Sequence, residues 1–352
     1  MDGRVFIIGG GLAGWRAAEA AFTGGADVTL AANGPGNTPD IHAINCPVLP
    51  EDSVELFVED TLAGGKYDND PALVETMCRE SVSLKDEFEF DGTVIRPLGC
   101  SVARAVSIRH AIGAIAVHDI KDRLKGKIRV ENRTVTPEEV LALRAKEPET
   151  KIIIATGGWC GKYDFSDNPK YLKGDGLVIA EALGAALKDV DEQHVQYEPT
   201  VRVEGPRRGI PVITTLLYEG GRMLNMEGKE FLGDARVNKD ELSKAIFREG
   251  GCAIFDLTAV PDEKILECNM DLSERLIKVA PAPHSSLGGI LIDTKCHALD
   301  SDGHIVNGVF ACGEVTAGVH GLNRLGGNGG TAAMVFGTIA GRQAALELQN
   351  NN

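Results

Sequence analysis

The chain has 352 residues, 43% of them hydrophobic, and this length predicts a folded protein with one large domain and a smaller insertion. Its 36 Lys and Arg residues against 51 Asp and Glu residues give a formal net charge of −15, which argues against nucleic acid and anionic lipid as partners. No apolar run approaches the ~20 residues of a membrane helix, and the N-terminus lacks a basic region followed by an apolar one. We therefore expect a cytoplasmic protein without direct membrane insertion.

The eight cysteines are widely scattered and include no C-x-x-C pair. This pattern favours reduced, individually buried thiols over a disulfide framework or an iron–sulfur cluster. His194 and His320 are not at metal-ligand spacing with any cysteine or carboxylate cluster, so we expect no metal site. If electrons leave this chain, another subunit would carry the metal centres.

Residues 4–8 form a short apolar run that predicts a strand, and residues 15–22 are Ala-rich and predict a helix. Between them lies GGGLAG, in which Gly9, Gly11 and Gly14 satisfy the spacing G-x-G-x-x-G. In this strand–turn–helix setting the motif is typical of dinucleotide binding, because the glycines let the backbone approach a pyrophosphate. The alternative is that the glycines only pack a helix on a sheet.

Residues 27–31 predict the second strand. In a dinucleotide fold the end of this strand carries an Asp or Glu for the adenosine ribose, but here only alanines and Asn33 are present. Asn33 could hydrogen-bond a hydroxyl group. The Pro- and Asn-rich loop that follows, residues 38–53, contains His42, which could lie against a flavin and even attach to it covalently. The alternative is a solvated loop histidine.

Residues 59–90 and 111–124 show helical periodicity, and Asp70 predicts an N-cap within the first of these ranges. The irregular stretch between the two ranges contains Arg104, and Arg109 follows it closely. These arginines could meet a pyrophosphate or a substrate carboxylate. The alternative is that both lie on the surface.

Two further glycine-rich turns follow predicted strands. Residues 151–159, KIIIATGGW, predict a buried strand that ends in a double glycine, and Asp175 then opens a helix, either as a ligand contact or only as its N-cap. Residues 309–330 begin as a short buried strand, continue as a glycine-rich turn and lead into an apolar helix over 331–348. Glycines let a backbone come close to a flat ligand, and the N–H groups that open the helix offer a positive pole to its carbonyl oxygens. A helix end of this kind can hold a reduced flavin.

Six blocks of the sequence resemble, in their order, the flavoprotein subunits of succinate dehydrogenase and fumarate reductase. L-aspartate oxidase and the soluble flavocytochrome c fumarate reductases share that order. The last block is most similar to the soluble fumarate reductases, whereas residues 59–77 are more similar to the succinate dehydrogenase and aspartate oxidase branch. The blocks are ATGGW (155–159), GDGLVIAEALGAAL (174–187), VQYEPT (195–200), GGRMLNMEGKEFL (220–232), PAPHSSLGGILID (281–293) and GVFACGEVTAGVHGLNRLGGNGG (308–330).

The resemblance implies an α/β fold in which a Rossmann-like domain binds FAD and a small α+β cap closes over the flavin ring. We assign residues 1–200 and 284–352 to the FAD-binding domain and residues 201–283 to a reduced cap. We predict non-covalent FAD. The residues expected to bind it are Gly9, Gly11, Leu12, Ala13, Gly14, Asn33, Thr38, Ala155, Thr156, Gly157, Asp175, Gly313, Glu314, Arg324, Gly327 and Asn328.

The resemblance also implies hydride transfer between flavin N5 and one carbon of an alkene or alkane next to a carboxylate. In the family a histidine and an arginine hold the carboxylates, and an arginine of the cap exchanges the proton. His284 and Arg324 match the first two. Glu198 stands where the family motif Q-F-H-P-T has histidine, and Lys239 stands at the place of the proton-transferring arginine, for which Arg236 could substitute.

These two departures change the predicted chemistry. A carboxylate at position 198 would repel a dicarboxylate in a dry site unless it is protonated or paired with Lys239. We therefore predict a small carboxylate-bearing or conjugated substrate, such as an enoate, other than fumarate. The cap and the C-terminal part are short for the family, which favours a subunit of a redox complex whose partner carries iron–sulfur or haem centres. The alternative is an FAD-carrying electron-transfer or assembly subunit without substrate chemistry.

Overall fold

The computed structural model describes residues 4–87, 94–97, 99–108, 111–233 and 237–350. Its six-stranded sheet has the order β14-β15-β7-β1-β2-β6, and every neighbouring pair is parallel except β14 with β15. The three strands that precede glycine-rich turns therefore end at the same edge of the sheet. The strands are β1 (Val5–Ile8), β2 (Val28–Ala32), β6 (Arg129–Asn132), β7 (Lys151–Ile154), β14 (His297–Leu299) and β15 (Ile305–Ala311).

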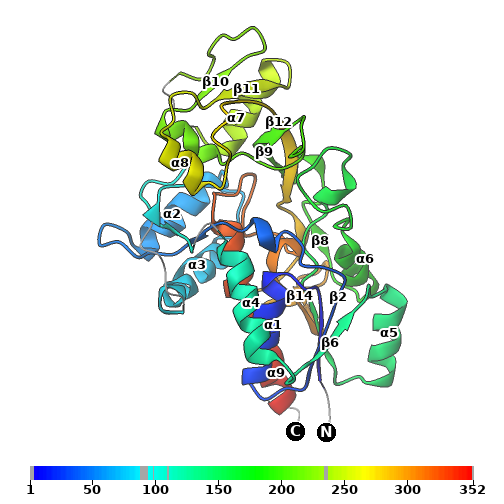
Figure 1. Cartoon of the computed structure of the whole chain (residues 1–352). Coiled ribbons are helices and arrows are strands. Elements are labelled where there is room, and N and C mark those ends of the chain that lie inside the picture. The colour runs from blue at the N-terminus through cyan, green and yellow to red at the C-terminus, as the bar shows by residue number, and fades with distance from the viewer. Residues whose placement is uncertain (1–3, 88–93, 98, 109–110, 234–236, 351–352) are drawn as a thin grey trace.

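The two ends of the chain pack against each other on this sheet (Figure 1). Helix α1 (Leu12–Thr23) lies along α9 (Asn328–Asn350), and α4 (Ile112–Leu124) lies along α1. A Cβ at Gly341 would stand 2.1 Å from the carbonyl oxygen of Ala17, so only glycine permits this close crossing of α1 and α9. The N-terminus and the C-terminus thus contribute to one core.

Helix α1 begins at Leu12, earlier than the predicted range of 15–22. The hydroxyl of Thr38 accepts a hydrogen bond from the Leu12 backbone N–H at 2.8 Å, so a distant side chain stabilises the start of the helix. Asp70 caps α3 as predicted, because its carboxylate accepts hydrogen bonds from the N–H groups of Ala72 and Leu73. The predicted helical range 59–90 contains the end of α2 (Val54–Gly64), α3 (Pro71–Glu80) and a 3₁₀ segment (Ser81–Asp86).

Arg104 precedes β5 (Ala105–Val106), which pairs with β3 (Ile44–Asn45) and β4 (Val94–Ile95). Its side chain is completely buried, with Nη2 2.9 Å from Asp52 Oδ1 and Nη1 2.8 Å from Asp60 Oδ2. Both interpretations of Arg104, as a ligand contact and as a surface residue, are therefore wrong. Arg109 lies outside the described residues.

The cap forms the upper part of the molecule in Figure 1. Its four strands are antiparallel in the order β10-β11-β12-β9, and its apolar side chains form a core of their own. The cap boundaries at 200/201 and 283/284 stay a prediction; they fall inside the two strands that continue into the main domain. The elements are β9 (Val195–Arg202), β10 (Arg222–Leu224), α7 (Lys239–Arg248), β11 (Ala253–Asp256), α8 (Asp262–Glu267) and β12 (Leu276–Ser286).

The remaining elements are α5 (Pro137–Lys146), α6 (Asp175–Ala182) and the pair β8 (Leu187–Lys188) and β13 (Gly289–Ile290). The N-cap of α6 is Gly174, at φ 90°, so the prediction that Asp175 caps this helix is wrong. None of the helices in the described ranges combines the length and the apolar character that a membrane span requires. A mostly parallel sheet with packed helices, together with a small α+β cap, confirms the predicted fold class.

Candidate active site

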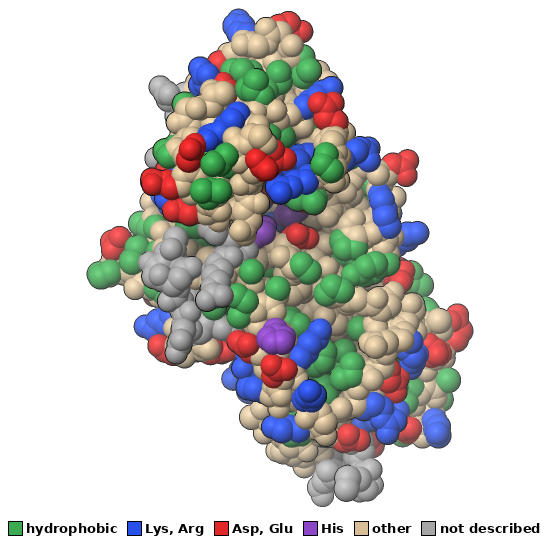
Figure 2. Space-filling view, viewed as in Figure 1, with side chains coloured by type: hydrophobic (Ala, Val, Ile, Leu, Met, Phe, Trp, Pro, Cys, Tyr) green, Lys and Arg blue, Asp and Glu red, His purple; other side chains and the backbone are tan. Residues whose placement is uncertain are grey.

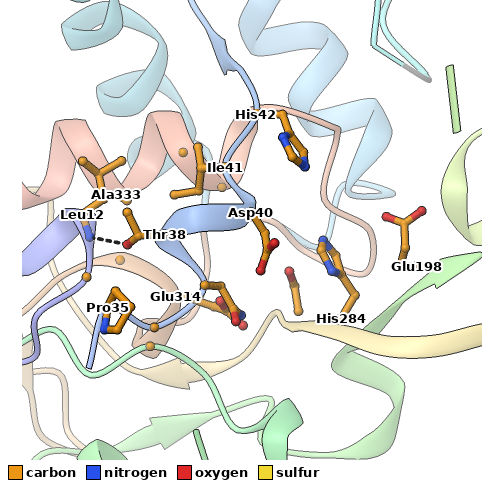
Figure 3. A pocket seen from close by; sticks show the side chains of 18 of the residues that line it. Leu12, Pro35, Thr38, Asp40, Ile41, His42, Glu198, His284, Glu314 and Ala333 are labelled. Atoms are coloured by element: carbon orange, nitrogen blue, oxygen red, sulfur yellow. Dashed lines mark hydrogen bonds between the residues drawn. The ribbon is translucent and has the colours of Figure 1, made fainter. Parts of the chain in front are cut away.

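A cavity of about 970 Å³ begins beside the start of α1 and extends to the cap. Figure 3 shows Leu12, Pro35 and Thr38 at one end, and His42, His284 and Glu198 at the other. Asp40 and Glu314 lie between these two groups (Figure 3). On the molecular surface, histidine side chains are visible in the hollow where the cap meets the main domain (Figure 2).

The first glycine-rich turn closes against the end of β7, and its glycines differ in how closely other atoms approach them. A Cβ at Gly9, where φ is 125°, would stand 2.1 Å from the carbonyl oxygen of Ala155, and one at Gly14 would stand 2.0 Å from that of Gly9. At Gly11 the nearest atoms would be Thr38 Oγ1 at 3.3 Å and the Pro35 carbonyl oxygen at 3.4 Å. Gly9 and Gly14 thus have the packing role, and Gly11 keeps the backbone open to a ligand.

All but two of the predicted cofactor-binding residues line this cavity. The exceptions are Gly14 and Asn328, which lie behind it. Asn328 is completely buried; its Nδ2 donates to Thr61 Oγ1 at 3.1 Å and its Oδ1 accepts from Asn45 Nδ2 at 2.6 Å, so it holds the turn before α9. The residues on the cavity are Gly9, Gly11, Leu12, Ala13, Asn33, Thr38, Ala155, Thr156, Gly157, Asp175, Gly313, Glu314, Arg324 and Gly327.

The residues present fit FAD. The buried hydroxyl of Thr156 has no hydrogen-bond partner within the described part of the chain, and it lines the cavity beside the start of α1. Helix α9 brings Gly329 and Gly330 of its first turn to the wall. An orphaned hydroxyl and helix starts suit a ligand that carries hydroxyl groups, a pyrophosphate and ring carbonyls. Glu314, held by the N–H and hydroxyl of Ser286 at 3.0 and 3.2 Å, adds a carboxylate that can accept from a ribityl hydroxyl.

The end of the cavity that would hold adenosine contains residues that the sequence did not indicate. Asn33 Nδ2 donates to the hydroxyl of Thr134 at 3.1 Å, which ties the end of β2 to the loop after β6. Thr134 and Val135 line the cavity beside Asn33. No motif marks these loop residues, so pattern reasoning could not have found them.

The opposite end of the cavity contains a buried ion pair. Lys239, the first residue of α7, pairs with Glu198 of β9. Glu198 is 3% exposed, and its Oε1 accepts hydrogen bonds from the hydroxyls of Thr214 and Thr200 at 2.9 and 3.1 Å. Burial alone would raise the pKa of Glu198, but the charges of Lys239 and His284 and the hydrogen bonds outweigh it and lower that pKa to about 2. Of the two states left open by the sequence, protonated or paired, the structure has the paired one.

His284 lies at an irregularity of β12, where the register with β9 shifts between Pro283 and Ser285. Such a bulge re-aims a side chain, and here it brings the imidazole to the cavity (Figure 3). Nδ1 of His284 lies 2.6 Å from Oδ2 of the buried Asp167, which leaves Nε2 for a ligand. Sequence reasoning missed Asp167, because it stands 117 residues from its partner without a motif.

Arg324 brings a guanidinium group to the same end of the cavity. Its Nε has no hydrogen-bond partner among the described residues, and Nη1 only approaches the carbonyl oxygen of Leu325 at 3.4 Å. A Cβ at Gly329 would stand 3.2 Å from Nη1, so the glycine of α9 leaves room for the group. Gln196 donates to the carbonyl oxygen of Arg324 at 2.7 Å and fixes the backbone beneath it. The guanidinium of Arg324 is thus fixed in place, and its Nε–H remains available to a ligand.

His320 also lines this part of the cavity but adds no charge. Burial and the nearby charge of Arg324 lower its pKa to about 3, so the imidazole is neutral at ordinary pH. Arg236, the second candidate for the proton donor, lies outside the described residues.

His194, for which the sequence shows no metal-ligand spacing with a carboxylate cluster, lies beside three aspartates in the structure. Its ligand atoms and those of Asp68 and Asp189 are within 4.8 Å of one another. The prediction from spacing was therefore wrong about this neighbourhood. Nδ1 of His194 lies 2.9 Å from Asp191 Oδ1, and this contact together with the pairing of opposite charges accounts for the cluster.

The profile of the family described as FAD binding domain matches residues 4–111 and 128–329. The chain belongs to the FAD-binding family of the succinate dehydrogenase and fumarate reductase flavoproteins. It is 30% identical to one subunit of the fumarate reductase (CoM/CoB) of Methanothermobacter marburgensis, over 87% of this chain and 64% of that protein. It is 28% identical to fumarate reductase (cytochrome) of Shewanella frigidimarina, over 99% of this chain and 78% of that protein.

A solved structure of similar fold is the open conformation of a flavocytochrome c3 fumarate reductase, with a TM-score of 0.77 and 25% identity over 99% of this chain and 78% of that one. The chain thus spans about two thirds to three quarters of the length of these relatives. Membership in this family confirms two predictions, FAD as the cofactor and a place among FAD-dependent oxidoreductases.

Proposed function

We propose that this protein is an FAD-dependent oxidoreductase acting on a small carboxylate-bearing substrate, for which an enoate and its saturated counterpart are the redox pair. The observation that carries the proposal is the meeting of His284, Arg324 and Lys239 at one end of the cavity that fits FAD. When bound, FAD would supply the hydride chemistry at its N5. This protein's own residues would then have to bind the carboxylate and move one proton.

Arg324 and His284 are the proposed carboxylate ligands. A guanidinium binds a carboxylate through two parallel N–H donors, and the imidazolium form of His284, in which both ring nitrogens carry a proton, can add a third hydrogen bond from Nε2. Both interactions draw negative charge toward the carboxylate. Both hydrogen-bonding interactions strengthen as negative charge develops there during hydride addition to the alkene. Asp167 would orient the imidazole through its hydrogen bond to Nδ1.

Lys239 is the proposed proton donor, with Arg236 as the other candidate. In the reducing direction an Nζ–H bond breaks as a C–H bond forms at the alkene carbon that does not receive the hydride, and the lysine becomes neutral. Its side chain is 19% exposed, so solvent can return the proton. Glu198 holds the ammonium group of Lys239 in place before the transfer.

We further propose that the chain works in the cytoplasm as one subunit of a redox complex. The electrons would come from, or pass to, a partner with iron–sulfur or haem centres, because the described residues bring together no cysteine cluster that could hold such a centre. The relative from Methanothermobacter marburgensis is itself one subunit of its fumarate reductase. The net charge of −15 suits a partner with a basic docking face.

The test is photoreduction of the purified protein without oxygen, followed by a panel of enoates. Reoxidation of the flavin by an enoate, with formation of the saturated acid, supports the proposal. If no enoate reoxidises the flavin while a co-purifying redox protein does, the proposal is wrong.

The second outcome would favour a carrier that holds FAD for electron transfer or assembly. One observation favours this second candidate. The Nζ of Lys239 is already paired with Glu198. Lys239 can therefore donate a proton to the substrate only if the ion pair opens, or if the proton leaves while Nζ is still paired. Lys239→Met should abolish enoate-dependent reoxidation in the enzyme but leave electron exchange with a partner unchanged in the carrier.

A further inference from the structure

Acidic side chains already lie beside the basic groups at the reacting end of the cavity before a substrate arrives. The carboxylates whose charges act on Arg324 are those of Glu314, Glu198 and Asp167. The basic groups that face them are Arg324, Lys239 and His284. Asp40 also lines the cavity beside His284 and Asp167, so four acidic side chains lie among these three basic ones, and His320 is neutral. Arg96 also lines the cavity, where its Nε donates to the carbonyl oxygen of Cys100.

Most of these charged groups are also already hydrogen-bonded within the protein. Both oxygens of Glu198 have donors, Lys239 on Oε2 and the two threonines on Oε1. Lys239 is committed to Glu198, and His284 is paired with Asp167. Among the described residues the Nε of Arg324 lacks a partner; the Nε of Arg202 lacks one too, but that guanidinium is paired with Glu274. One strong anion-binding position is therefore open.

The segment beyond the ion pair brings apolar side chains to the cavity, and Arg202, which also lines it, is paired with Glu274. The segment that carries Thr214 also brings Pro211, Ile213 and Leu216 to the cavity. The backbone N–H of Val212 donates to the carbonyl oxygen of Thr200 at 2.8 Å, which fixes this segment against β9. A substrate whose carboxylate lies on Arg324 would thus place its other end against an apolar wall and an ionised Glu198.

We propose that the substrate is a monocarboxylate enoate with an uncharged far end, and that the Glu198–Lys239 pair is the specificity element that rejects a second carboxylate. This inference rests on the proposed function and narrows its substrate class. Arg324 supplies one positive charge for one carboxylate. A second carboxylate would meet Glu198 at short range, with Lys239 already neutralised.

The first test uses the oxidised protein with its FAD and needs no variant. Fumarate and monomethyl fumarate share one carbon skeleton and differ by one charge when their carboxyl groups are ionised, and crotonate is a second monoanion. Binding of each is measured by calorimetric titration and by the change in the flavin absorption spectrum. We expect monomethyl fumarate and crotonate to bind at least about tenfold more tightly than fumarate.

The second test removes the negative charge. Glu198→Gln leaves Lys239 unpaired, so fumarate should gain at least about tenfold in affinity relative to monomethyl fumarate. Glu263→Gln, which removes an exposed carboxylate on α8, is the control and should leave the ratio unchanged. If Glu198→Gln does not fold, the ratio of the affinities for monomethyl fumarate and fumarate, measured on the unaltered protein, still decides whether a second carboxylate is rejected.

The outcomes separate this inference from the proposed function. Tighter binding of fumarate than of its monomethyl ester by the unaltered protein overturns the inference and leaves the proposed enoate chemistry standing. A ratio that Glu198→Gln does not move overturns the role given to the ion pair. If the protein binds none of the three compounds and none reoxidises its flavin, the proposed function fails and the inference fails with it.

Discussion

Arg324 is the residue on which substrate binding should depend most, because its planar guanidinium offers paired donors that a lysine cannot reproduce. We expect Arg324→Lys to lower kcat/KM for enoate reduction by about 100-fold while the FAD content stays the same. Reoxidation of the photoreduced flavin, followed by stopped-flow absorbance, measures this. Arg342→Lys, at a side chain that is 62% exposed, is the control. An equal loss in both variants would contradict the assignment.

His320 predicts a pH dependence of stability at the same site. Its pKa is about 3 in the folded protein against 6.5 in the unfolded chain, so below about pH 6.5 the unfolded chain binds a proton that the folded protein refuses. This contribution is fully present above pH 6.5 and is lost as the pH falls toward 3. Between pH 6.5 and 5 the free energy of unfolding should fall by about 2 kcal/mol from this group alone.

Urea denaturation of the wild-type protein and of His320→Asn at both pH values measures that contribution. Asparagine does not titrate, so the variant should lose about 2 kcal/mol less than the wild type on acidification. His118→Asn, at a side chain that is 74% exposed, should behave as the wild type. Parallel losses in His320→Asn and the wild type would mean that His320 takes up a proton in the folded protein.

The sequence singled out residues that lie together at the cap end of the cavity, but not all of their partners. His284, Arg324, Glu198 and Lys239 could be singled out, because each stands in a block that resembles the family or departs from it. The pairing of Glu198 with Lys239 was one of two stated alternatives. Asp167 could not be predicted, because its contact with His284 depends on a bulge that no residue pattern marks.

At the scale of elements, a buried ion network ties α2 to β5. Arg104 contacts Asp52 and Asp60, and its guanidinium lies 4.8 Å from the ring centroid of Phe57. Arg104→Met would leave two carboxylates unpaired, so we expect the free energy of unfolding to fall by about 3–5 kcal/mol. Urea denaturation measures it. Arg79→Met removes an exposed pair with Glu75 and should leave stability nearly unchanged; similar effects of both variants would refute the network.

The glycine-rich turns after β1, β7 and β15 were predicted well because each joins a short apolar strand to a break in periodicity. Element boundaries were predicted less well. The start of α1 depends on Thr38, which is 26 residues away, and the N-cap of α6 is a glycine at positive φ rather than the neighbouring Asp175. In both cases a backbone position set by tertiary contacts overrides the local preference of the side chain.

At the scale of the whole molecule, the sheet order explains why the two ends of the chain had to be considered together. β1 and β15 both pair with β7, so the first and last glycine-rich turns open onto one cavity. Similar glycine turns at opposite ends of a sequence made this meeting predictable. The contribution of the loop after β6 was not predictable, because its position follows from the parallel pairing of β6 with β2.

The same arrangement offers FAD many separate contacts, so we predict that the folded chain holds it without a covalent bond. His42 lines the cavity near Asp40 and His284, so it is the histidine to test (Figure 3). We expect the yellow colour to leave the polypeptide on acid denaturation, and His42→Ala to retain the flavin content of the wild type. His118→Ala is the control. The flavin-free chain should regain thermal stability when FAD is added, by about 2.7 kcal/mol at a hundredfold excess over Kd. Flavin that stays with the denatured polypeptide and is lost only in His42→Ala would show a covalent bond instead.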